Sequence, residues 1–157
     1  MKLEAKVLTV SDGVHHGVRE DKSGAALVDQ LTAEGWTVVD HRVVPDGVES
    51  VADALGTMCA DFAGLVVTTG GTGFGPRDLT PEGTLTVLER QAPGIAEATR
   101  SVNPKLGRLS RGAAGTLGNA VVVNTPGSPK GCVECLGAVL DMIPHALSLM
   151  TGETTIH

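Results

Sequence analysis

The stretch from Thr68 to Thr84, TTGGTGFGPRDLTPEGT, has the residue types of an anion-binding loop. It follows the apolar run GLVV and places four glycines in six positions, ahead of an Arg-Asp pair and Thr-Pro-Glu. A glycine-rich turn between a strand and a helix exposes backbone N–H groups beside the positive end of the helix, which suits a phosphate. The glycines match neither a Walker A loop nor the G-x-G-x-x-G dinucleotide pattern. A tight structural turn is the alternative interpretation.

A carboxylate follows these glycines at Asp78. Thr80 precedes Pro81 and is the predicted N-cap of the next helix, because Thr is a favoured cap and Pro fits the first helical position. Asp78 is then free to face a ligand, and a carboxylate beside phosphates is typical of a bridging Mg²⁺. Asp46 and Asp12 follow other predicted strands and could converge on the same ion, although each taken alone is typical of a turn.

A second candidate anion site is NTPGSPK, residues 124–130. Gly127 permits close approach of the backbone, and Ser128 offers a hydroxyl while repeating, with Pro129, the signal for a helix start. Lys130 could meet a charged group or be a solvated surface lysine. Two helix starts of the same design indicate either one ligand with phosphates at both ends or two ligands that meet.

The cysteines and adjacent histidines are weaker candidates. Cys132 and Cys135 have the spacing of a redox pair, but the third cysteine, Cys59, is distant and no second pair or histidine stands at metal-ligand spacing. His15 and His16 lie in a loop flanked by glycine with no evident third ligand, so exposed histidines are the favoured interpretation.

Composition excludes several classes of protein. The chain has 157 residues, enough for one domain, residues 1–157, with a full core. A net charge of −6, no basic run and three aromatic residues argue against a nucleic-acid partner. No apolar stretch approaches the ~20 residues of a membrane span, and the start MKLEAKVLTV does not resemble a signal peptide. A reduced, cytoplasmic protein is therefore expected.

Predicted strands and helices alternate along the chain. Strands are expected at residues 4–10, 36–44 and 64–69, and a hairpin with Gly118-Asn119 in its turn at 114–124. Helices are expected before Gly35, across 48–62, from Thr80, through most of 93–111, and after Ser128 with a kink or break at Pro144. Residues 11–21 are expected to form a polar loop. This alternation predicts an α/β fold with a mostly parallel sheet and helices on both faces.

Ligands of such sheets lie at the carboxyl ends of the strands, near a switch in strand order. Four stretches with unusual residues fall at those ends: 11–13, 45–47, 68–78 and 124–128. We therefore expect one site formed from all four.

TTGGTGFGPRDLTPEGT and NTPGSPKG together resemble the molybdopterin adenylyltransferase family of molybdenum-cofactor biosynthesis (MogA/MoaB type), a group that includes the gephyrin G domain. The resemblance covers nearly the whole chain, including SDG, EDKSG, VVPDG and LSRG. It implies a three-layer α/β sandwich that assembles as a homotrimer or as a hexamer. It also implies that AMP is transferred from Mg-ATP to the terminal phosphate of molybdopterin with release of pyrophosphate. The implied partners are these substrates and the downstream molybdate-insertion enzyme.

The resemblance assigns Asp46 and Asp78 as the catalytic, Mg²⁺-binding carboxylates. Its implied substrate- and nucleotide-binding residues are Ser11, Asp12, Thr69, Gly70, Gly71, Thr72, Gly73, Ser110, Arg111, Pro126, Gly127 and Ser128. Three residues depart from the family pattern: Gly47 replaces a frequent acidic residue, Gly83 an alanine and Thr125 a leucine. Gly47 leaves one fewer carboxylate near the metal, which affects fine specificity more than the class of reaction.

The implied reaction fits the residues present. A phosphate monoester has its second pKa at about 6, so it is already ionised at neutral pH and needs no general base. It needs charge screening and in-line alignment instead. Two alternatives are a molybdopterin carrier, or diverged paralogue, without adenylylation activity, and a trimeric interaction scaffold. Pyrophosphate release separates the enzyme from the carrier.

Overall fold

The computed structural model describes residues 1–153, so the last four residues of the expected domain lie outside the described part. Its strands are β1 (Glu4–Val10), β2 (Thr37–Val44), β3 (Gly64–Thr69), β4 (Arg90–Gln91), β5 (Ala114–Leu117) and β6 (Ala120–Thr125). Its helices are α1 (Asp12–His15), α2 (Lys22–Ala33), α3 (Val48–Cys59), α4 (Thr80–Val87), α5 (Pro93–Ser101), α6 (Pro104–Gly107), α7 (Pro129–Gly137) and α8 (Ile143–Met150).

The strands form one sheet in the order β2-β1-β3-β6-β5-β4. β1 pairs in parallel with β2 and β3, and β3 pairs in parallel with β6. β5 pairs antiparallel with β6 on one side and with β4 on the other, and β4 forms the far edge of the sheet. The chain leaves β1 toward β2 and then returns past it to β3, so the order of the strands switches between β1 and β3. That is where ligands of doubly wound sheets bind.

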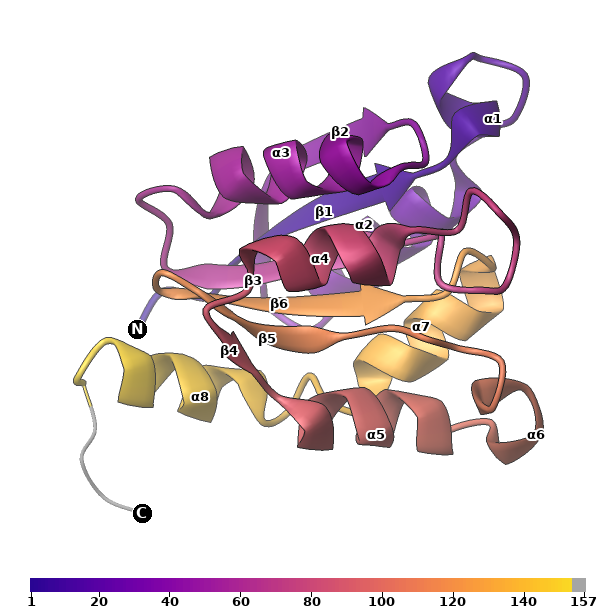
Figure 1. Ribbon diagram of the computed structural model, residues 1–157. Coiled ribbons are helices and arrows are strands. Elements are labelled where there is room, and N and C mark those ends of the chain that lie inside the picture. Colours follow the sequence, from indigo (N-terminus) through magenta and orange to yellow (C-terminus); the bar gives the residue numbers. More distant parts are fainter. Residues whose placement is uncertain (154–157) are drawn as a thin grey trace.

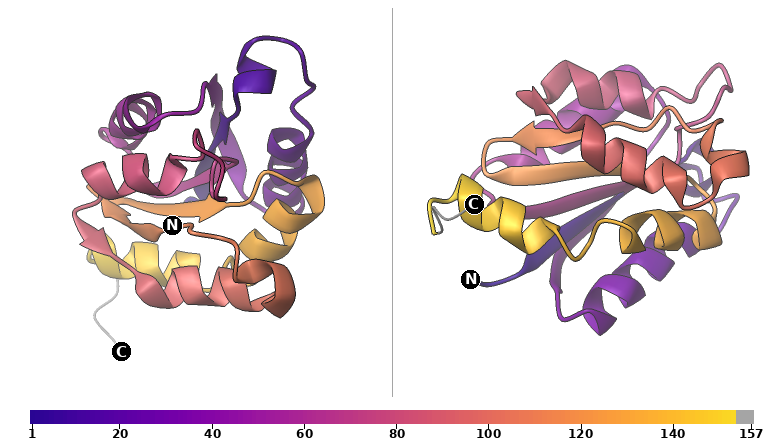
Figure 2. Two further views of the ribbon diagram at one scale, coloured as in Figure 1. Left: turned by 45° about the vertical axis from the view of Figure 1, so that its right-hand side comes forward. Right: turned by 90° about the horizontal axis from the view of Figure 1, so that it is seen from below.

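Alternating apolar residues of the strands belong to two separate hydrophobic cores, one on each face of the sheet. Leu8, Val66 and Val122 pack against Val51 and Leu55 of α3 on one face. The other face is covered by α2, α5, α7 and α8. Figures 1 and 2 show the resulting three layers, with α3 and α4 on one side of the sheet and α5, α7 and α8 on the opposite side. The predicted three-layer α/β class is confirmed.

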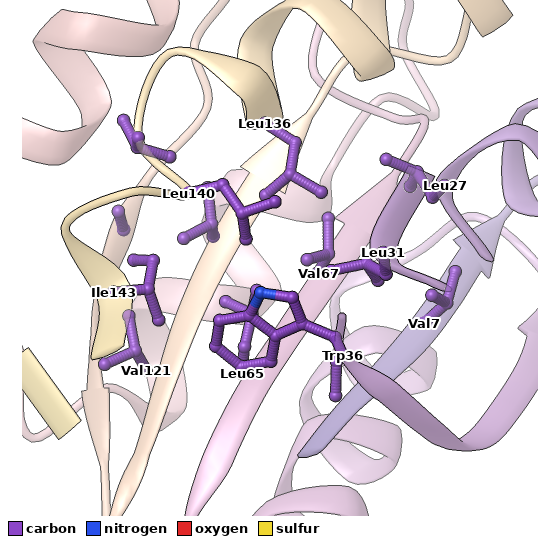
Figure 3. Packing of buried hydrophobic residues seen from close by; sticks show 14 of the residues in the cluster. Val7, Leu27, Leu31, Trp36, Leu65, Val67, Val121, Leu136, Leu140 and Ile143 are labelled. Atoms are coloured by element: carbon purple, nitrogen blue, oxygen red, sulfur yellow. The ribbon is translucent and has the colours of Figure 1, made fainter. Parts of the chain in front are cut away.

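The larger core includes the chain's one tryptophan. Figure 3 shows the indole of Trp36 beside Leu31 and Leu65, and Trp36 is only 5% exposed. Leu136 of α7 and Ile143 of α8 belong to the same cluster and are fully buried. These contacts fix α2, α7 and α8 to the sheet, and thereby fix the loops from which α2 and α7 begin.

Most of the predicted elements are confirmed, including the hairpin, whose two-residue turn contains Gly118 at φ +58°. Four details differ. Residues 12–15 of the expected polar loop form α1, because the Ser11 hydroxyl accepts a hydrogen bond from the N–H of Val14. Phe62 is buried but follows the end of α3. The short edge strand β4 was not predicted.

The fourth difference is that the break in the last helix lies earlier than Pro144. Helix α7 ends at Gly137, and Pro144 lies in the first turn of α8, where its missing N–H costs no helical hydrogen bond. Among residues 1–153, no helix combines the length and apolar character needed to cross a membrane.

Candidate functional site

The four strand-end stretches meet around a cavity of about 840 Å³ at the carboxyl ends of the parallel strands. We call residues 70–79, between β3 and α4, the glycine loop, and residues 126–128, between β6 and α7, the second loop. Both lie at the right-hand side of Figure 1, above α7 in that view. The predicted residues that line the cavity are Ser11, Asp46, Thr69, Gly70, Gly71, Thr72, Gly73, Asp78, Ser110, Pro126, Gly127 and Ser128.

Two consecutive glycines give the glycine loop its sharp exit from β3. Gly70 and Gly71 have φ of +99° and +68°, which other residues rarely adopt. A Cβ at Gly70 would collide with the carbonyl of Val10, and one at Gly71 with the side chain of Thr80. The bare backbone therefore lies directly against the end of β1 and the start of α4.

The carboxylates of Asp46 and Asp12 each accept a hydrogen bond from the other residue's backbone N–H. The Oδ2 atom of Asp46 accepts from the N–H of Asp12 at 2.9 Å, and the Oδ1 atom of Asp12 accepts from the N–H of Asp46 at 3.1 Å. Arg77 donates through Nε and Nη2 to the Asp12 carboxylate, at 2.6 and 3.0 Å, and through Nη2 to the carbonyl of Asp46. Asp12 is therefore paired with arginine outside the cavity lining, whereas Asp46 faces the cavity.

The pKa values of the Asp12 and Asp46 carboxyl groups are shifted in opposite directions. The hydrogen bond from Arg77 lowers the pKa of Asp12. Burial raises the pKa of Asp46, and the neighbouring carboxylates of Asp12 and Asp78 raise it further. A buried carboxylate among other acids has a stronger interaction with an added cation, because that cation offsets both the desolvation and the repulsion.

Asp78 lines the cavity but also has a structural contact. Its Oδ2 atom accepts from the N–H of Gly75 at 2.8 Å, which closes a short turn inside the glycine loop. The expectation that Thr80 caps α4 is wrong: the N-cap is Leu79, without a side-chain capping bond, and Thr80 is the first helical residue. Within the described residues the buried Thr80 hydroxyl has no hydrogen-bond partner.

The second loop has a simpler geometry. The Ser128 hydroxyl accepts from the N–H of Gly131 at 3.0 Å and caps α7 as predicted. The Thr69 hydroxyl donates to the carbonyl of Pro126 at 2.8 Å, and a Cβ on Gly127 would lie 3.3 Å from the Cα of Gly70. The two loops are therefore in direct contact. The side chain of Lys130 is 88% exposed and faces Glu134 at 3.8 Å, which agrees with a solvated surface lysine.

Comparison with known proteins decides the family. Residues 6–145 match the family described as "Probable molybdopterin binding domain". The chain is 38% identical to a molybdopterin adenylyltransferase of Helicobacter pylori, over 94% of this chain and 87% of that protein. It is 41% identical to the crystal structure of the molybdopterin biosynthesis enzyme MoaB of Thermus thermophilus, with a TM-score of 0.87 over 96% and 97% of the two chains. The chain belongs to the molybdopterin adenylyltransferase family.

The similarity extends to a longer protein and to a further solved structure. The chain is 35% identical to gephyrin of Dictyostelium discoideum, over 94% of this chain but 22% of that protein. A structure from Mycobacterium abscessus, titled a molybdopterin biosynthesis protein, has a TM-score of 0.90 at 33% identity, over 96% and 97% of the chains. The similarity therefore extends over nearly the whole of this chain in both comparisons.

Arg111 is one of the binding residues that the adenylyltransferase resemblance implied, and it lies beside the cavity rather than in its lining. Its guanidinium donates to the carbonyls of Gly73 and Asp78, at 2.8 and 2.6 Å, and binds the Glu82 carboxylate. Its own N–H donates to the carbonyl of Thr72 at 2.9 Å. These contacts join the segment before β5 to Thr72 and Gly73 near the start of the glycine loop and to Asp78 near its end.

Several cavity residues escaped the sequence analysis. Val102, Leu106 and Leu109 form an exposed apolar wall around α6, and Arg19 and Lys22 bring positive charge to the opposite side. The apolar spacing of four and then three residues, in an otherwise polar segment, is the signal that could have identified the first three. The two cations have no comparable signal, because isolated Lys and Arg are ordinary surface residues.

The donor set fits a magnesium ion that arrives with a nucleotide. Within residues 1–153, no three His, Cys, Asp or Glu side chains are grouped so as to hold a metal by themselves. Asp46 and Asp78 line the same cavity, close enough for the charge of Asp78 to raise the pKa of Asp46. Magnesium is commonly bound by one or two carboxylates while substrate phosphates and water complete its shell.

The cysteines have the environments of structural residues. Cys132 is fully buried, and burial raises the pKa of its thiol to about 11. Burial also raises the pKa of Cys135, whose side chain reaches the cavity wall. Neutral thiols are poor nucleophiles and poor metal ligands, so neither residue has the environment of a redox centre.

Proposed function

We propose that the protein transfers AMP from Mg-ATP to the terminal phosphate of molybdopterin and releases pyrophosphate. The observation that carries the proposal is the joint placement of Asp46, Asp78, the glycine loop and the second loop around one cavity. These stretches are far apart in the sequence, and a volume of about 840 Å³ falls within the range of small-molecule sites. The resemblance to molybdopterin adenylyltransferases supplies the substrates.

The two loops supply N–H groups for the anions. The glycine loop offers backbone without side chains, and the second loop leads directly into α7, whose amino end carries partial positive charge. Arg19 and Lys22 line the same cavity and add full positive charges. This arrangement explains how a chain of net charge −6 can hold two phosphate-bearing substrates.

Asp46 and Asp78 are the residues that hold Mg²⁺ in this proposal. A bound Mg²⁺ would supply positive charge that stabilises the negative charge developing on the phosphates. The raised pKa of Asp46 favours this role, because a nearby cation stabilises the ionised carboxylate.

The attacking group needs no base from the protein. The terminal phosphate of molybdopterin is largely ionised at neutral pH, since its second pKa is about 6. The chain's contribution is to hold donor and acceptor phosphates in line and to exclude alternative geometries. The contact between the two loops, at Gly70 and Gly127, brings two anion-holding backbones to adjacent positions.

The experiment is to supply the purified protein with Mg-ATP and molybdopterin and to measure pyrophosphate and the adenylylated product. Stoichiometric formation of both products is expected, with none when molybdopterin or Mg²⁺ is omitted. Binding of molybdopterin without pyrophosphate release would favour the carrier and overturn the proposed reaction.

The assembly and its setting belong to the same proposal. We infer a homotrimer or a hexamer in the cytoplasm, with the product passed to the downstream molybdate-insertion enzyme. Sedimentation velocity at several protein concentrations tests the assembly, and a monomer at all of them would contradict it.

A further inference from the structure

The side chain and backbone of Arg111 bind the glycine loop and the start of α4 through several hydrogen bonds. Nε donates to the carbonyl of Gly73 at 2.8 Å, Nη2 donates to the carbonyl of Asp78 at 2.6 Å, and Nη1 binds the carboxylate of Glu82. The main-chain N–H of Arg111 adds a hydrogen bond to the carbonyl of Thr72. Three of its four partners belong to the glycine loop, and the fourth lies in the first turn of α4.

The side-chain contacts of Arg111 lie at both ends of the loop segment that includes the Asp78 carboxylate. Gly73 and Asp78 stand at the two ends of a six-residue segment, and between them the Asp78 carboxylate closes back onto the N–H of Gly75. Of the side chains in residues 1–153, only that of Arg111 donates hydrogen bonds to main-chain carbonyls of the glycine loop. Arg111 thus holds the backbone at both ends of this segment from a distant part of the chain, while Arg77 inside the segment binds Asp12.

We propose that Arg111 is a positioning residue that acts through Asp78 rather than through contact with either substrate. The inference rests on the proposed function, because it assigns Asp78 its role in holding Mg²⁺. Arg111 is absent from the cavity lining, and its side chain is 33% exposed, with its donors directed at loop carbonyls and Glu82. Lysine cannot replace it, since one ammonium group cannot reach three separated acceptors in the way that a guanidinium fork does.

The decisive experiment is a double-mutant cycle between Arg111→Met and Asp78→Asn, read by adenylylation kinetics. Arg111→Met is expected to lower kcat by about 10²-fold, the scale of a catalytic group displaced by about 1 Å, while KM for ATP and for molybdopterin stays within about twofold. The double variant is expected to be no slower than Asp78→Asn alone, because residues that act through one another are not additive. Additive losses, or a tenfold rise in either KM, would overturn the proposal in favour of direct substrate binding.

Two further variants separate positioning from general damage to the fold. Arg108→Met removes an arginine three positions earlier that donates only to the carbonyl of Lys105, and it should leave kcat unchanged. Arg111→Lys keeps the charge but is expected to behave like Arg111→Met. If Arg111→Met fails to fold, Glu82→Gln tests the same arrangement with less damage, and an intermediate loss of kcat at unchanged KM is expected.

Hydrogen exchange of the substrate-free protein gives a readout that does not need activity. The peptide that contains residues 72–79 should exchange faster in Arg111→Met than in the parent or in Arg108→Met, while the peptides of β1 and β3 are unchanged. If the parent releases no pyrophosphate, the proposed reaction fails on its own, and the exchange result still decides whether Arg111 holds the loop. Unchanged exchange of that peptide would overturn the positioning role.

Discussion

The glycine loop and the second loop both lead from a buried strand through glycine to a helix with proline in its first turn, yet they are held in different ways. The second loop is held by uncharged groups: the Ser128 hydroxyl caps α7, and the Thr69 hydroxyl at the end of β3 donates to the carbonyl of Pro126. The glycine loop has no side-chain cap at α4 and is fixed by residues distant in the sequence, Asp12 through Arg77 and Arg111 from the segment before β5.

This difference parallels the division of roles in the proposed function, in which the carboxylates hold Mg²⁺ and the second loop binds an anion. The glycine loop and its neighbours carry the carboxylates, whose positions must be controlled closely, and they are braced by two arginines. The second loop carries no acid and offers backbone N–H groups and a hydroxyl. The expectation that the two helix starts share one design is therefore wrong: only α7 has a capping side chain, and only the glycine loop has charged side chains tied to distant segments.

The largest predicted effect is the loss of the charge at Asp78. Asp78→Asn keeps an oxygen that can accept from the N–H of Gly75, so the loop stays closed while the charge proposed to hold Mg²⁺ is removed. Turnover should fall by at least ~10²-fold, as for removal of one preorganised electrostatic element. The Mg²⁺ concentration that gives half-maximal turnover should rise.

The control for Asp78→Asn is Asp53→Asn, a change on the exposed side of α3 away from the cavity. Melting temperatures of both variants should stay close to that of the parent. Near-normal turnover of Asp78→Asn would refute its role in holding the metal, and an unfolded variant would show that its main duty is to close the turn.

The second prediction tests the backbone role of the second loop. Gly127 has no positive φ, so its backbone conformation does not exclude a side chain, but a branched side chain there would press on the Cα of Gly70. Gly127→Val should raise KM for one substrate by roughly tenfold or more, the cost of one lost charge-assisted hydrogen bond, with little change in kcat. Gly94→Val is the control, because a Cβ there meets nothing within 4 Å. An unchanged KM for both substrates would remove the second loop from the site.

A third prediction concerns pH and the stability of the fold. The pKa of Asp46 is raised by burial, so the folded state favours the neutral carboxyl and loses stability as pH rises from about 4, where an unfolded Asp ionises, through the folded pKa. Asp46→Asn should therefore melt at a higher temperature than the parent at pH 7, and the advantage should shrink toward pH 4.

Asp12 should behave in the opposite way. Its pKa is lowered by Arg77, so it stabilises the fold above about pH 4 and loses that contribution as pH falls through the folded pKa. Asp12→Asn should melt below the parent at pH 7 and approach it in acid. Thermal melts of both variants across this pH range decide the matter, and parallel curves for the two would contradict the assigned environments.

The sequence was a good guide to the elements and to the edge of the sheet where the site lies. Periods of apolar residues predicted the strands and helices because burial on a sheet face or helix face dictates that spacing. The rule for the carboxyl ends of strands then brought the four stretches together. Sequence could not place Arg77 on Asp12 or Arg111 on Asp78, because pairs separated by 65 and 33 positions are set only by the finished fold. It predicted the wrong N-cap for α4, because Thr is a favoured cap and Leu is not, whereas the helix begins at Thr80 and Leu79 precedes it without a side-chain capping bond.

The smallest predicted effect lies behind the second loop, at Cys132. The thiol is fully buried in the first turns of α7, where its sulfur lies 3.2 Å from the carbonyl of Pro129 and 3.6 Å from that of Ser23. Cys132→Ser keeps a donor for these carbonyls and removes any disulfide with Cys135, so turnover should stay within about twofold of the parent, while stability falls by roughly 1 kcal/mol for the exchanged sulfur. The thiol's pKa of about 11 keeps it neutral at pH 7, so it is a poor nucleophile and brings no charge to the site. Turnover and melting temperature should be measured with and without a thiol reductant. A reductant-dependent activity in the parent that disappears in Cys132→Ser would reveal a redox role for the helix behind the second loop.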